Sequence, residues 1–269
     1  MLITSLQNEK IKRLVRLREK KGRDKEKCTL IEGFRLLSRA LECNVPILEL
    51  YFCRKFFLGE NEDKLISMAQ LRGAKIFETN SNVFRKFAYR DRPEGLAAII
   101  PIKQHSLKSF IPHENATYLV LQSLEKPGNL GSILRTADGA GVDGVIICEK
   151  RTDIYNPNVL TASTGAIFTV PIAEDLSENI CKWLRKNKIK IVITSPHAKK
   201  KYTDENMTGS IAIVIGSEQC GLDKFWFKHA DSEVYIPMLG MADSLNAAIS
   251  ASILLYEIAR QKEWRKAKK

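Results

Sequence analysis

The sequence predicts an α/β protein in which a C-terminal, mostly parallel sheet is preceded by a small α/β domain. In the second part, short apolar runs of strand length alternate with helical segments, which is typical of parallel strands covered on both faces. The 269 residues are enough for one large domain or two ordinary ones. Prolines and polar residues interrupt the periodic pattern at positions 101–116. We therefore expect domains at residues 1–105 and 106–269.

In the first part, the apolar spacing predicts three helices and three strands. Ile11 and Leu14 lie at helical spacing in a basic segment, and Leu37 and Leu41 do the same in the next one. In chain order, the expected elements are helix Asn8–Lys21, helix Leu30–Cys43, strand Ile47–Cys53, helix Lys64–Arg72, and strands Ala74–Phe77 and Leu96–Ile100.

In the second part, five apolar runs have the length of strands, and helical segments separate several of them. The expected strands are Tyr118–Gln122, Val145–Cys148, Lys190–Thr194, Ala212–Ile215 and Glu233–Ile236, and the expected helices are Leu130–Ala140, Leu176–Asn187 and Leu245–Arg260. Ligands of such sheets bind beyond the carboxyl ends of strands. The candidate binding loops are therefore those that follow residues 122, 194, 215 and 236.

The chain is strongly basic, with a formal net charge of +12 and a pI of about 9.4. A folded protein this basic usually meets a polyanion, most often nucleic acid, although a lysine-rich surface also serves solubility alone. The basic residues gather in three runs, which favours an electrostatic footprint for nucleic acid. The runs are Lys10, Lys12, Arg13, Arg16, Arg18, Lys20, Lys21, Arg23, Lys25 and Lys27; Lys199, Lys200 and Lys201; and Lys262, Arg265, Lys266, Lys268 and Lys269.

Several classes of site have no motif in this sequence. The six cysteines form no C-x-x-C pair and the four histidines no H-E-x-x-H, so we expect neither a zinc site nor a disulfide framework. Scattered thiols fit a reducing cytosol. The N-terminus lacks the apolar core of a signal peptide, and no apolar run is long enough to span a membrane. We therefore expect a cytoplasmic protein with no metal and no membrane partner.

One glycine motif matches a dinucleotide-binding fingerprint by spacing only. Gly139, Gly141 and Gly144 fit G-x-G-x-x-G, but that fingerprint needs a strand before it and a helix after it. Here the order is reversed, so the glycines are better explained as the end of a helix. The sequence also contains no P-loop and no G-x-S-x-G nucleophile elbow.

Three loops that follow predicted strands carry candidate functional residues. The first holds Asn129, placed to cap a helix, and Arg135, more than one turn further on among apolar neighbours. The second places Glu218 between two glycines at the end of a strand. The third leads into a long apolar helix, for which Ser244 is the expected N-cap and Asn246 a weak helix former inside the first turn. A cap, a solvated face or a tight turn is the plain structural alternative for each residue.

Taken together and in this order, the loops resemble the three motifs of the SpoU-type (TrmH-like) RNA methyltransferases of the SPOUT superfamily. The matching stretches are N-x-G-S-I-L-R-T from Asn129, I-G-S-E-x-x-G-L from Ile215, and I-P-M followed by S-L-N-A-A from Ile236. The S-T-G-A stretch from Ser163 is similar to a further family stretch. The N-terminal region, with I-E-G from Ile31, resembles the family's accessory substrate-binding domain, so the resemblance covers nearly the whole chain.

The resemblance implies an enzyme that uses S-adenosylmethionine to methylate a ribose 2′-hydroxyl of RNA and that works as a homodimer. It also implies a deep trefoil knot near the end of the C-terminal domain, with the cofactor bound in the knot. The implied catalytic residues are Asn129, Arg135, Glu218, Ser244 and Asn246. The implied cofactor-binding residues are Thr194, Ser195, Ile215, Gly216, Glu218, Gly221, Ile236, Met238, Ser244, Leu245, Asn246 and Ala247. Glycines there would let backbone amides approach the adenosine closely.

Two roles remain open for Arg135. The resemblance implies that it assists deprotonation of the ribose hydroxyl, but a guanidinium rarely gives up its proton in proteins. The other role is a clamp on a nearby phosphate that also stabilises the forming alkoxide. Asn129 is assigned to orienting Arg135 or the substrate, and Glu218 to polar anchoring. Ser244 and Asn246 are assigned to positioning the substrate and the loop.

Large-subunit ribosomal RNA is the expected substrate, because the accessory domain suits a folded RNA, and transfer RNA is the alternative. A base methyltransferase of the wider superfamily and a non-catalytic RNA-binding protein are two further alternatives. The Asn–Arg and Ser-Leu-Asn stretches favour ribose, and the joint presence of all five polar residues favours catalysis. The sequence does not distinguish a housekeeping enzyme from an antibiotic-resistance enzyme.

Overall fold

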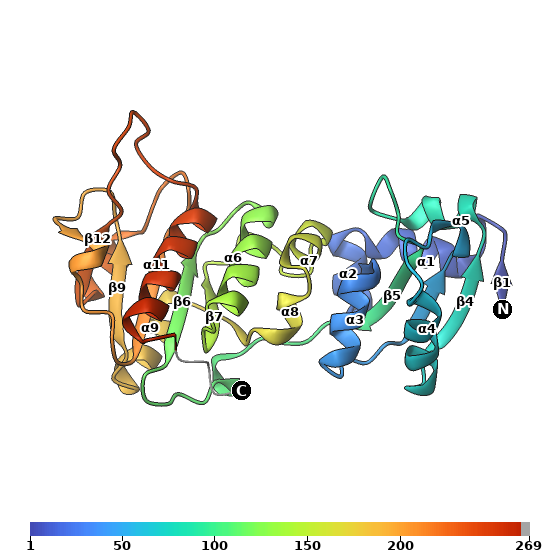
Figure 1. The fold of residues 1–269 in the computed structure, drawn as a ribbon, viewed down its shortest axis with the longest axis horizontal. Helices are drawn as coiled ribbons and strands as arrows, with labels where there is room; N and C mark the ends of the chain where they lie inside the picture. Colours follow the sequence, from blue (N-terminus) through green and yellow to red (C-terminus); the bar gives the residue numbers. More distant parts are fainter. Residues whose placement is uncertain (265–269) are drawn as a thin grey trace. The chain divides into compact units, whose positions relative to one another are not determined.

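The computed structural model describes residues 1–264 of the chain (Figure 1). The chain forms two compact units. The N-terminal unit consists of Met1–Gln104 together with Asp153–Phe168, and the C-terminal unit consists of His105–Thr152 together with the described residues from Thr169 onward. Four members of the predicted basic C-terminal run lie outside the described residues: Arg265, Lys266, Lys268 and Lys269.

The N-terminal unit contains a mixed five-stranded sheet in the order β1-β4-β3-β5-β2. Strands β1 (Leu2–Ile3), β4 (Lys75–Thr79) and β3 (Glu49–Phe52) are parallel to one another. Strand β5 (Leu96–Pro101) runs antiparallel to both β3 and β2 (Cys28–Glu32). The small α/β domain expected from the sequence is therefore present.

Helices pack against this sheet through apolar side chains. One core cluster joins Ile11 and Leu14 to Phe84, Phe87 and Tyr51, all of which are at most 1% exposed. The helices of this unit are α1 (Glu9–Leu17), α2 (Lys20–Glu26), η1 (Arg54–Phe56), α3 (Phe34–Glu42), α4 (Glu62–Leu71), α5 (Ser81–Phe87), α7 (Pro157–Ser163) and most of α8 (Ala166–Thr169).

Two expected helices of the first part were wrong in their bounds. The segment Asn8–Lys21 is broken, because α1 ends at Leu17 and α2 begins at Lys20. The segment Leu30–Cys43 begins as a strand, because β2 includes Leu30 to Glu32 and every residue of β2 is buried. Gly33 follows with a φ of 99°, a conformation that ends the strand and that glycine adopts without strain. Because β2 is buried on both faces, its sequence lacks the alternation of apolar and polar residues that would have identified it as a strand.

The C-terminal unit contains a seven-stranded sheet in the order β10-β12-β9-β11-β6-β7-β8, and all of its strand pairs are parallel. This confirms the predicted parallel sheet. The expected strands form with small changes of bounds, and β8 and β10 are additional. The strands are β6 (Thr117–Gln122), β7 (Gly144–Cys148), β8 (Ile172–Asp175), β9 (Lys190–Thr194), β10 (Lys200–Lys201), β11 (Ile211–Ile215) and β12 (Ser232–Tyr235).

Helices cover both faces of this sheet. Apolar residues of α9 (Ser177–Lys186) and α10 (Lys224–His229) pack with one set of strand side chains in a buried cluster. Helices α6 (Pro127–Gly139) and α11 (Ala247–Gln261) lie side by side (Figure 1), and the hydroxyls of Thr136 and Ser252 are 3.0 Å apart between them. The remaining short helices are η2 (Leu107–Ser109) and η3 (Tyr202–Asp204).

The glycines that match G-x-G-x-x-G end a helix, as expected. Helix α6 ends at Gly139, Gly141 has a φ of 67°, and β7 begins at Gly144. The order helix, glycines, strand excludes the dinucleotide-binding arrangement. Within residues 1–264, no helix has the length and apolar character needed to cross a membrane.

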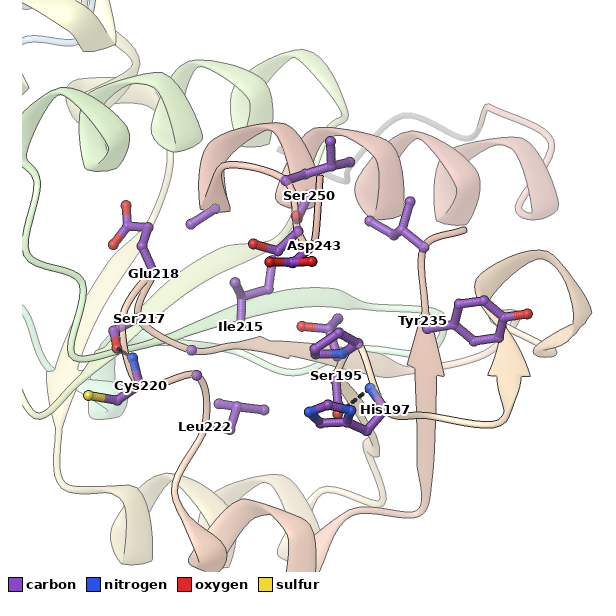
Figure 2. Close-up of a pocket in the computed structure, with 18 of the residues that line it drawn as sticks. Ser195, His197, Ile215, Ser217, Glu218, Cys220, Leu222, Tyr235, Asp243 and Ser250 are labelled. Carbon is purple, nitrogen blue, oxygen red and sulfur yellow. Dashed lines mark hydrogen bonds between the residues drawn. The ribbon is translucent and has the colours of Figure 1, made fainter. Parts of the chain in front are cut away.

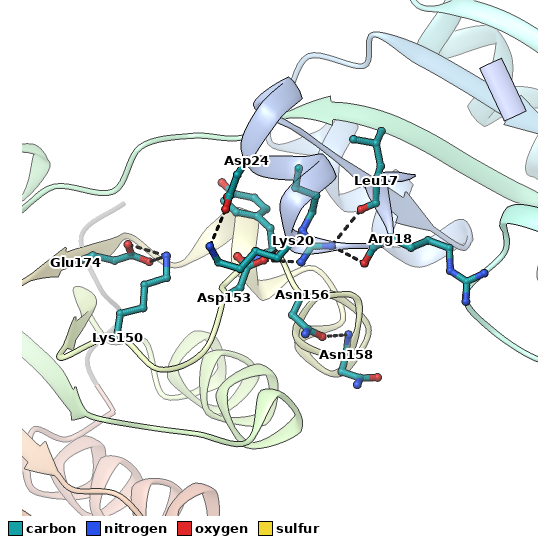
Figure 3. A network of polar contacts seen from close by, with 11 residues as sticks. Leu17, Arg18, Lys20, Asp24, Lys150, Asp153, Asn156, Asn158 and Glu174 are labelled. Carbon is teal, nitrogen blue, oxygen red and sulfur yellow. Dashed lines mark hydrogen bonds and ion pairs between the residues drawn. The ribbon is translucent and has the colours of Figure 1, made fainter. Parts of the chain in front are cut away.

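Residues 153–168 follow β7 in the chain but belong to the N-terminal unit. A buried ion pair holds the start of this segment, because Arg23 is 2% exposed and its Nη2 lies 2.6 Å from Oδ2 of Asp153. The same guanidinium donates to the carbonyls of Leu17, at 3.1 Å, and Arg18, at 2.6 Å (Figure 3). Each of the three guanidinium nitrogens thus donates a hydrogen bond within the unit.

Some basic residues assigned to the nucleic-acid footprint are used within the fold instead. Arg23 is one of them, and Arg13 is another, since its Nη1 lies 2.9 Å from Oε1 of Glu49. Lys262 donates from Nζ to the hydroxyl of Thr117 at 2.7 Å and to two neighbouring carbonyls. Burial lowers the pKa of Lys262 to about 8, although a nearby carboxylate acts in the opposite direction. The footprint is therefore smaller than the composition suggested.

Candidate functional site

A pocket of about 660 Å³ opens in the C-terminal unit at the carboxyl ends of β9, β11 and β12 (Figure 2). This volume lies within the range of about 300–1,000 Å³ that is usual for small-molecule sites. Residues 194–197 and 215–222 line it, and so do residues between 234 and 250 and the side chain of Phe227. These are three of the four loops expected to bind a ligand, and only the loop after residue 122 does not line the pocket.

The segment after β11 folds back on itself beside the pocket. Ser217 and Gly221 exchange two backbone hydrogen bonds of 3.2 and 3.1 Å, and Gly221 has a φ of 65°. A Cβ atom on Gly216 would lie 2.2 Å from the carbonyl carbon of Gly221 and 2.5 Å from the amide nitrogen of Leu222. Residue 216 must therefore be glycine because the backbone of the same loop leaves no room for a Cβ atom. The sequence had suggested another reason, the close approach of backbone amides to a ligand.

Most residues that the sequence assigned to cofactor binding line the pocket. They are Thr194, Ser195, Ile215, Gly216, Glu218, Gly221, Ile236, Met238, Ser244, Leu245 and Ala247, whereas Asn246 is not among the lining residues. The sequence reasoning missed other lining residues in these loops or in the adjoining strand and helix, namely Pro196, His197, Ser217, Gln219, Cys220, Leu222, Tyr235, Ala242, Asp243 and Ser250. Their only sequence signal was their position next to the motif residues.

Three of the assigned polar side chains form one hydrogen-bonded chain. The Nδ2 of Asn129 donates to Oε1 of Glu218, and the Nδ2 of Asn246 donates to Oδ1 of Asn129 at 3.2 Å. Asn129 thus connects the first turn of α6 to the loop after β11 and to the start of α11. The structure brings together residues from all three sequence motifs, although they are 89 and 117 positions apart.

Two expected helix caps were wrong. Asn129 does not cap α6, because the helix begins two residues earlier at Pro127, and proline is favoured at the first helical position. Ser244 does not cap α11, because Asn246 is the N-cap and its Oδ1 accepts from the amide of Ala248 at 2.9 Å. Asparagine is among the best N-cap residues, so the position of Asn246 has a local structural reason as well.

Arg135 lies apart from this chain. It is an exposed residue of α6, it does not line the pocket, and its side chain makes no hydrogen bond or ion pair with residues 1–264. Glu125, a carboxylate ten residues earlier in the chain, is therefore not bound to it. A cation that no carboxylate neutralises is available to an anionic group from another molecule.

The pocket lining fits an adenosine-bearing cofactor. Ile215, Leu222 and Leu245 provide apolar contacts, while hydroxyls and backbone amides provide polar ones. The Oγ of Ser195, a residue that is 7% exposed, accepts from the amide of His197 at 3.1 Å and holds the loop after β9 in place (Figure 2). Among the described residues, no cluster of three or more histidine, cysteine or acidic side chains is arranged to hold a metal ion.

The chain matches two family models. Residues 116–256 match the SpoU rRNA Methylase family, and residues 8–98 match the MRM3-like substrate binding domain. A crystallised RNA 2′-O ribose methyltransferase is 36% identical, with a TM-score of 0.87 over 98% of this chain and 100% of that chain.

Two further proteins resemble nearly the whole chain. An S-adenosylmethionine-bound rRNA methyltransferase from Sinorhizobium meliloti is 31% identical, with a TM-score of 0.89 over 97% of each chain. The 23S rRNA (guanosine(2553)-2′-O)-methyltransferase of Bacillus subtilis is 27% identical over 95% of this chain and 98% of its own length. The chain belongs to the SpoU rRNA methylase family, and it is an S-adenosylmethionine-dependent RNA 2′-O-methyltransferase.

Proposed function

We propose that this enzyme methylates a ribose 2′-hydroxyl in large-subunit ribosomal RNA. The observation that carries the proposal is the pocket together with the hydrogen bonds beside it. Through these bonds Asn129 of the first motif connects to Glu218 of the second and Asn246 of the third. The 23S rRNA specificity of the Bacillus subtilis relative, which aligns over nearly its full length, supports the choice of RNA. Transfer RNA remains the alternative substrate. The cytoplasm, where both RNAs are found, is the proposed location.

In the proposed reaction, S-adenosylmethionine supplies the methyl group when it is bound in the pocket. Asn129, Glu218 and Asn246 hold the pocket loops in one arrangement and thereby position the reacting groups. Arg135 binds the ribose or its phosphate and stabilises the developing oxyanion, because its guanidinium is exposed and no described residue neutralises it. Ser244 lines the pocket and assists in positioning the substrate.

Cofactor binding is proposed to need no metal. Calorimetry with S-adenosylmethionine in the presence of a chelator should show one site per chain. An absence of heat together with an unchanged melting temperature would contradict this assignment.

The enzyme is proposed to act as a homodimer through the C-terminal unit, with a trefoil knot at the cofactor site. Helix α11 leaves three large apolar side chains exposed at or just beyond it: Ile249, Tyr256 and Trp264, at 51%, 46% and 60%. Apolar side chains this exposed favour burial against another protein surface. Sedimentation at micromolar concentration should show a species of twice 30.5 kDa, and a purely monomeric species would contradict the dimer.

The N-terminal unit is proposed to supply RNA affinity and target choice, in line with its match to a substrate-binding domain. Deletion of residues 1–100 does not test this cleanly, because residues 153–168 belong to the same compact unit and would lose their packing. Point substitutions on the exposed face of α1 and α2 leave this packing intact and are the better test.

The substrate is tested by mapping 2′-O-methylation in ribosomal and transfer RNA from cells with and without the gene. We expect one ribose of large-subunit ribosomal RNA to lose its methyl group when the gene is absent. A loss confined to transfer RNA would establish the alternative substrate, and no change in either RNA would contradict the proposal.

A further inference from the structure

The N-terminal unit contains a buried carboxylate with one unsatisfied oxygen. Glu32, the last residue of β2, is 8% exposed, and its Oε2 accepts from the amide of Tyr89 at 2.7 Å. Its Oε1 is buried and has no hydrogen-bond partner among residues 1–264. A buried acceptor without a partner costs free energy, so native proteins usually provide one from a ligand or from water.

Glu32 lines a small hollow that adjoins a larger one. The small hollow has room for one water-sized group, about 20 Å³, and the larger measures about 440 Å³. Both are lined by Leu36 of α3 and by Leu160 and Thr161 of α7, so they adjoin one another. We name the pair of hollows, defined by these three shared residues, the α3–α7 groove.

The rim of the α3–α7 groove combines an aromatic ring with cationic side chains. Tyr89 lines the small hollow and is 37% exposed, and the guanidinium carbon of Arg18 lies 5.7 Å from its ring centroid. Arg35 and Arg90 line the larger hollow. Arg90 is paired with Glu94, whereas Arg35 is exposed and has no ion-pair partner among residues 1–264. Aromatic rings with neighbouring arginines are the usual platform for unpaired bases, and a free arginine suits a phosphate.

We propose that the α3–α7 groove binds one unpaired nucleotide of the RNA substrate whose base carries an exocyclic amino group. The amino group donates to the free Oε1 of Glu32, the base packs near Tyr89, and Arg35 contacts the phosphate. The small hollow matches an amino group in size. Cytosine, adenine and guanine carry this group, whereas uracil presents a carbonyl acceptor where cytosine has its amine. This inference rests on the proposed RNA substrate.

The test compares two single-stranded oligonucleotides of equal length, hexacytidylate and hexauridylate, by fluorescence anisotropy with the full-length protein. The wild type should bind the cytidine oligomer about tenfold more tightly, which is the usual effect of one hydrogen bond to a charged acceptor. In Glu32→Gln, the amide of Tyr89 keeps the side-chain oxygen, so the NH₂ group turns toward the groove. That variant should prefer the uridine oligomer.

Two further variants complete the test. Glu62→Gln is the matched control, because Glu62 is 3% exposed, also has one oxygen without a partner, and lines neither hollow. It should keep the wild-type preference. Thr161→Phe adds a ring at an exposed position shared by both hollows, and it should abolish the preference without a polar group being buried.

Equal binding of both oligomers by the wild type, or an unchanged preference in a folded Glu32→Gln protein, would show that the hollow holds only water and would overturn the inference. If Glu32→Gln does not fold, an unchanged preference in Thr161→Phe has the same meaning. Methyl transfer to ribosomal RNA is measured in parallel with the wild type. Normal transfer without base preference would refute the groove alone, whereas absent transfer with a clear preference would refute the proposed function alone.

Discussion

The pocket of the C-terminal unit and the α3–α7 groove of the N-terminal unit are built from different parts of the chain. The pocket is shaped by backbone loops whose course depends on Gly216 and Gly221. The groove is lined by side chains of β2, α3 and α7 and of the loop between α5 and β5, among them arginines, a tyrosine and Glu32. A site made by backbone is sensitive to an added methyl group, whereas a site made by charged side chains is sensitive to substitution and to salt.

The largest expected effect is a loss of stability of the N-terminal unit, where the ion pair of Arg23 and Asp153 holds the segment 153–168. Asp153→Ala leaves Arg23 buried without its carboxylate, and loss of one partner of a buried pair costs about 3–5 kcal/mol of unfolding free energy. Denaturant unfolding measures it. Asp63→Ala is the control, because its pair with Arg54 is exposed on both sides and contributes little to stability. Equal stabilities of the two variants would contradict a structural role for the buried pair.

The next effect concerns catalysis by the C-terminal unit. Arg135→Ala should lower single-turnover methylation on the order of 100-fold while leaving melting temperature and cofactor affinity unchanged, because no described residue binds this side chain. Arg151→Ala, at another exposed arginine of the C-terminal unit with no described partner, should keep the wild-type rate.

Arg135→Lys separates the two roles left open for this residue. Lysine keeps the charge and loses the planar fork, so a point charge near phosphate would be largely rescued and a forked clamp would not. A rescue that appears only at raised pH would instead favour proton transfer. Near-normal rates in both Arg135 variants would remove the residue from the catalytic assignment.

A further cluster of charged side chains in the C-terminal unit lies around Glu205, next to Lys190 at the start of β9. Burial opposes ionisation of Glu205, but hydrogen bonds from Lys190, Ser232 and Lys200 outweigh it and lower the pKa to about 2. Since the unfolded value is 4.5, the stabilisation is complete above that pH and is lost as the pH falls toward 2. The change should be on the order of 2 kcal/mol in acid unfolding. Glu205→Gln should flatten this part of the stability profile, and an unchanged profile would contradict the assignment.

A backbone-shaped pocket predicts a specific sensitivity to an added methyl group. Gly216→Ala should displace the loop, because the new Cβ would overlap the backbone at Gly221, and cofactor affinity should fall about tenfold. Gly240→Ala is the control, since its Cβ would meet nothing within 4 Å. Calorimetry with S-adenosylmethionine measures both variants. Equal affinities would show that the loop adapts and that the backbone does not fix the pocket.

The smallest effect concerns salt. Arg16, Lys21 and Lys25 are exposed on α1 and α2 and have no described ion-pair partner. Their joint replacement by glutamine should reduce the slope of log affinity for RNA against log salt concentration by about 2. The matched control replaces exposed lysines of the C-terminal unit, namely Lys182, Lys186 and Lys188. An equal change of slope in both triple variants would show that RNA affinity depends on the net charge of the protein and not on where the positive charges lie.

The sequence by itself determined the parallel sheet, the loops that line the pocket and the family. These follow from local patterns: β6, β9 and β11 are continuous apolar runs, and parallel strands end at one edge of the sheet, so loops far apart in sequence meet there. The same local reasoning misplaced the cap of α6 by three residues and the cap of α11 by two, because proline at the start of α6 and asparagine at the start of α11 competed with the residues chosen.

Only the tertiary structure decided which polar side chains meet and which charges are free. The contact of Asn129 with Glu218 spans 89 positions, and that of Arg23 with Asp153 spans 130, so no periodicity reports either one. For the same reason, the sequence patterns did not predict strand β2, the membership of residues 153–168 in the N-terminal unit, or the burial of Lys262. Burial and long-range pairing depend on how distant elements pack, whereas local spacing constrains only the element in which it occurs.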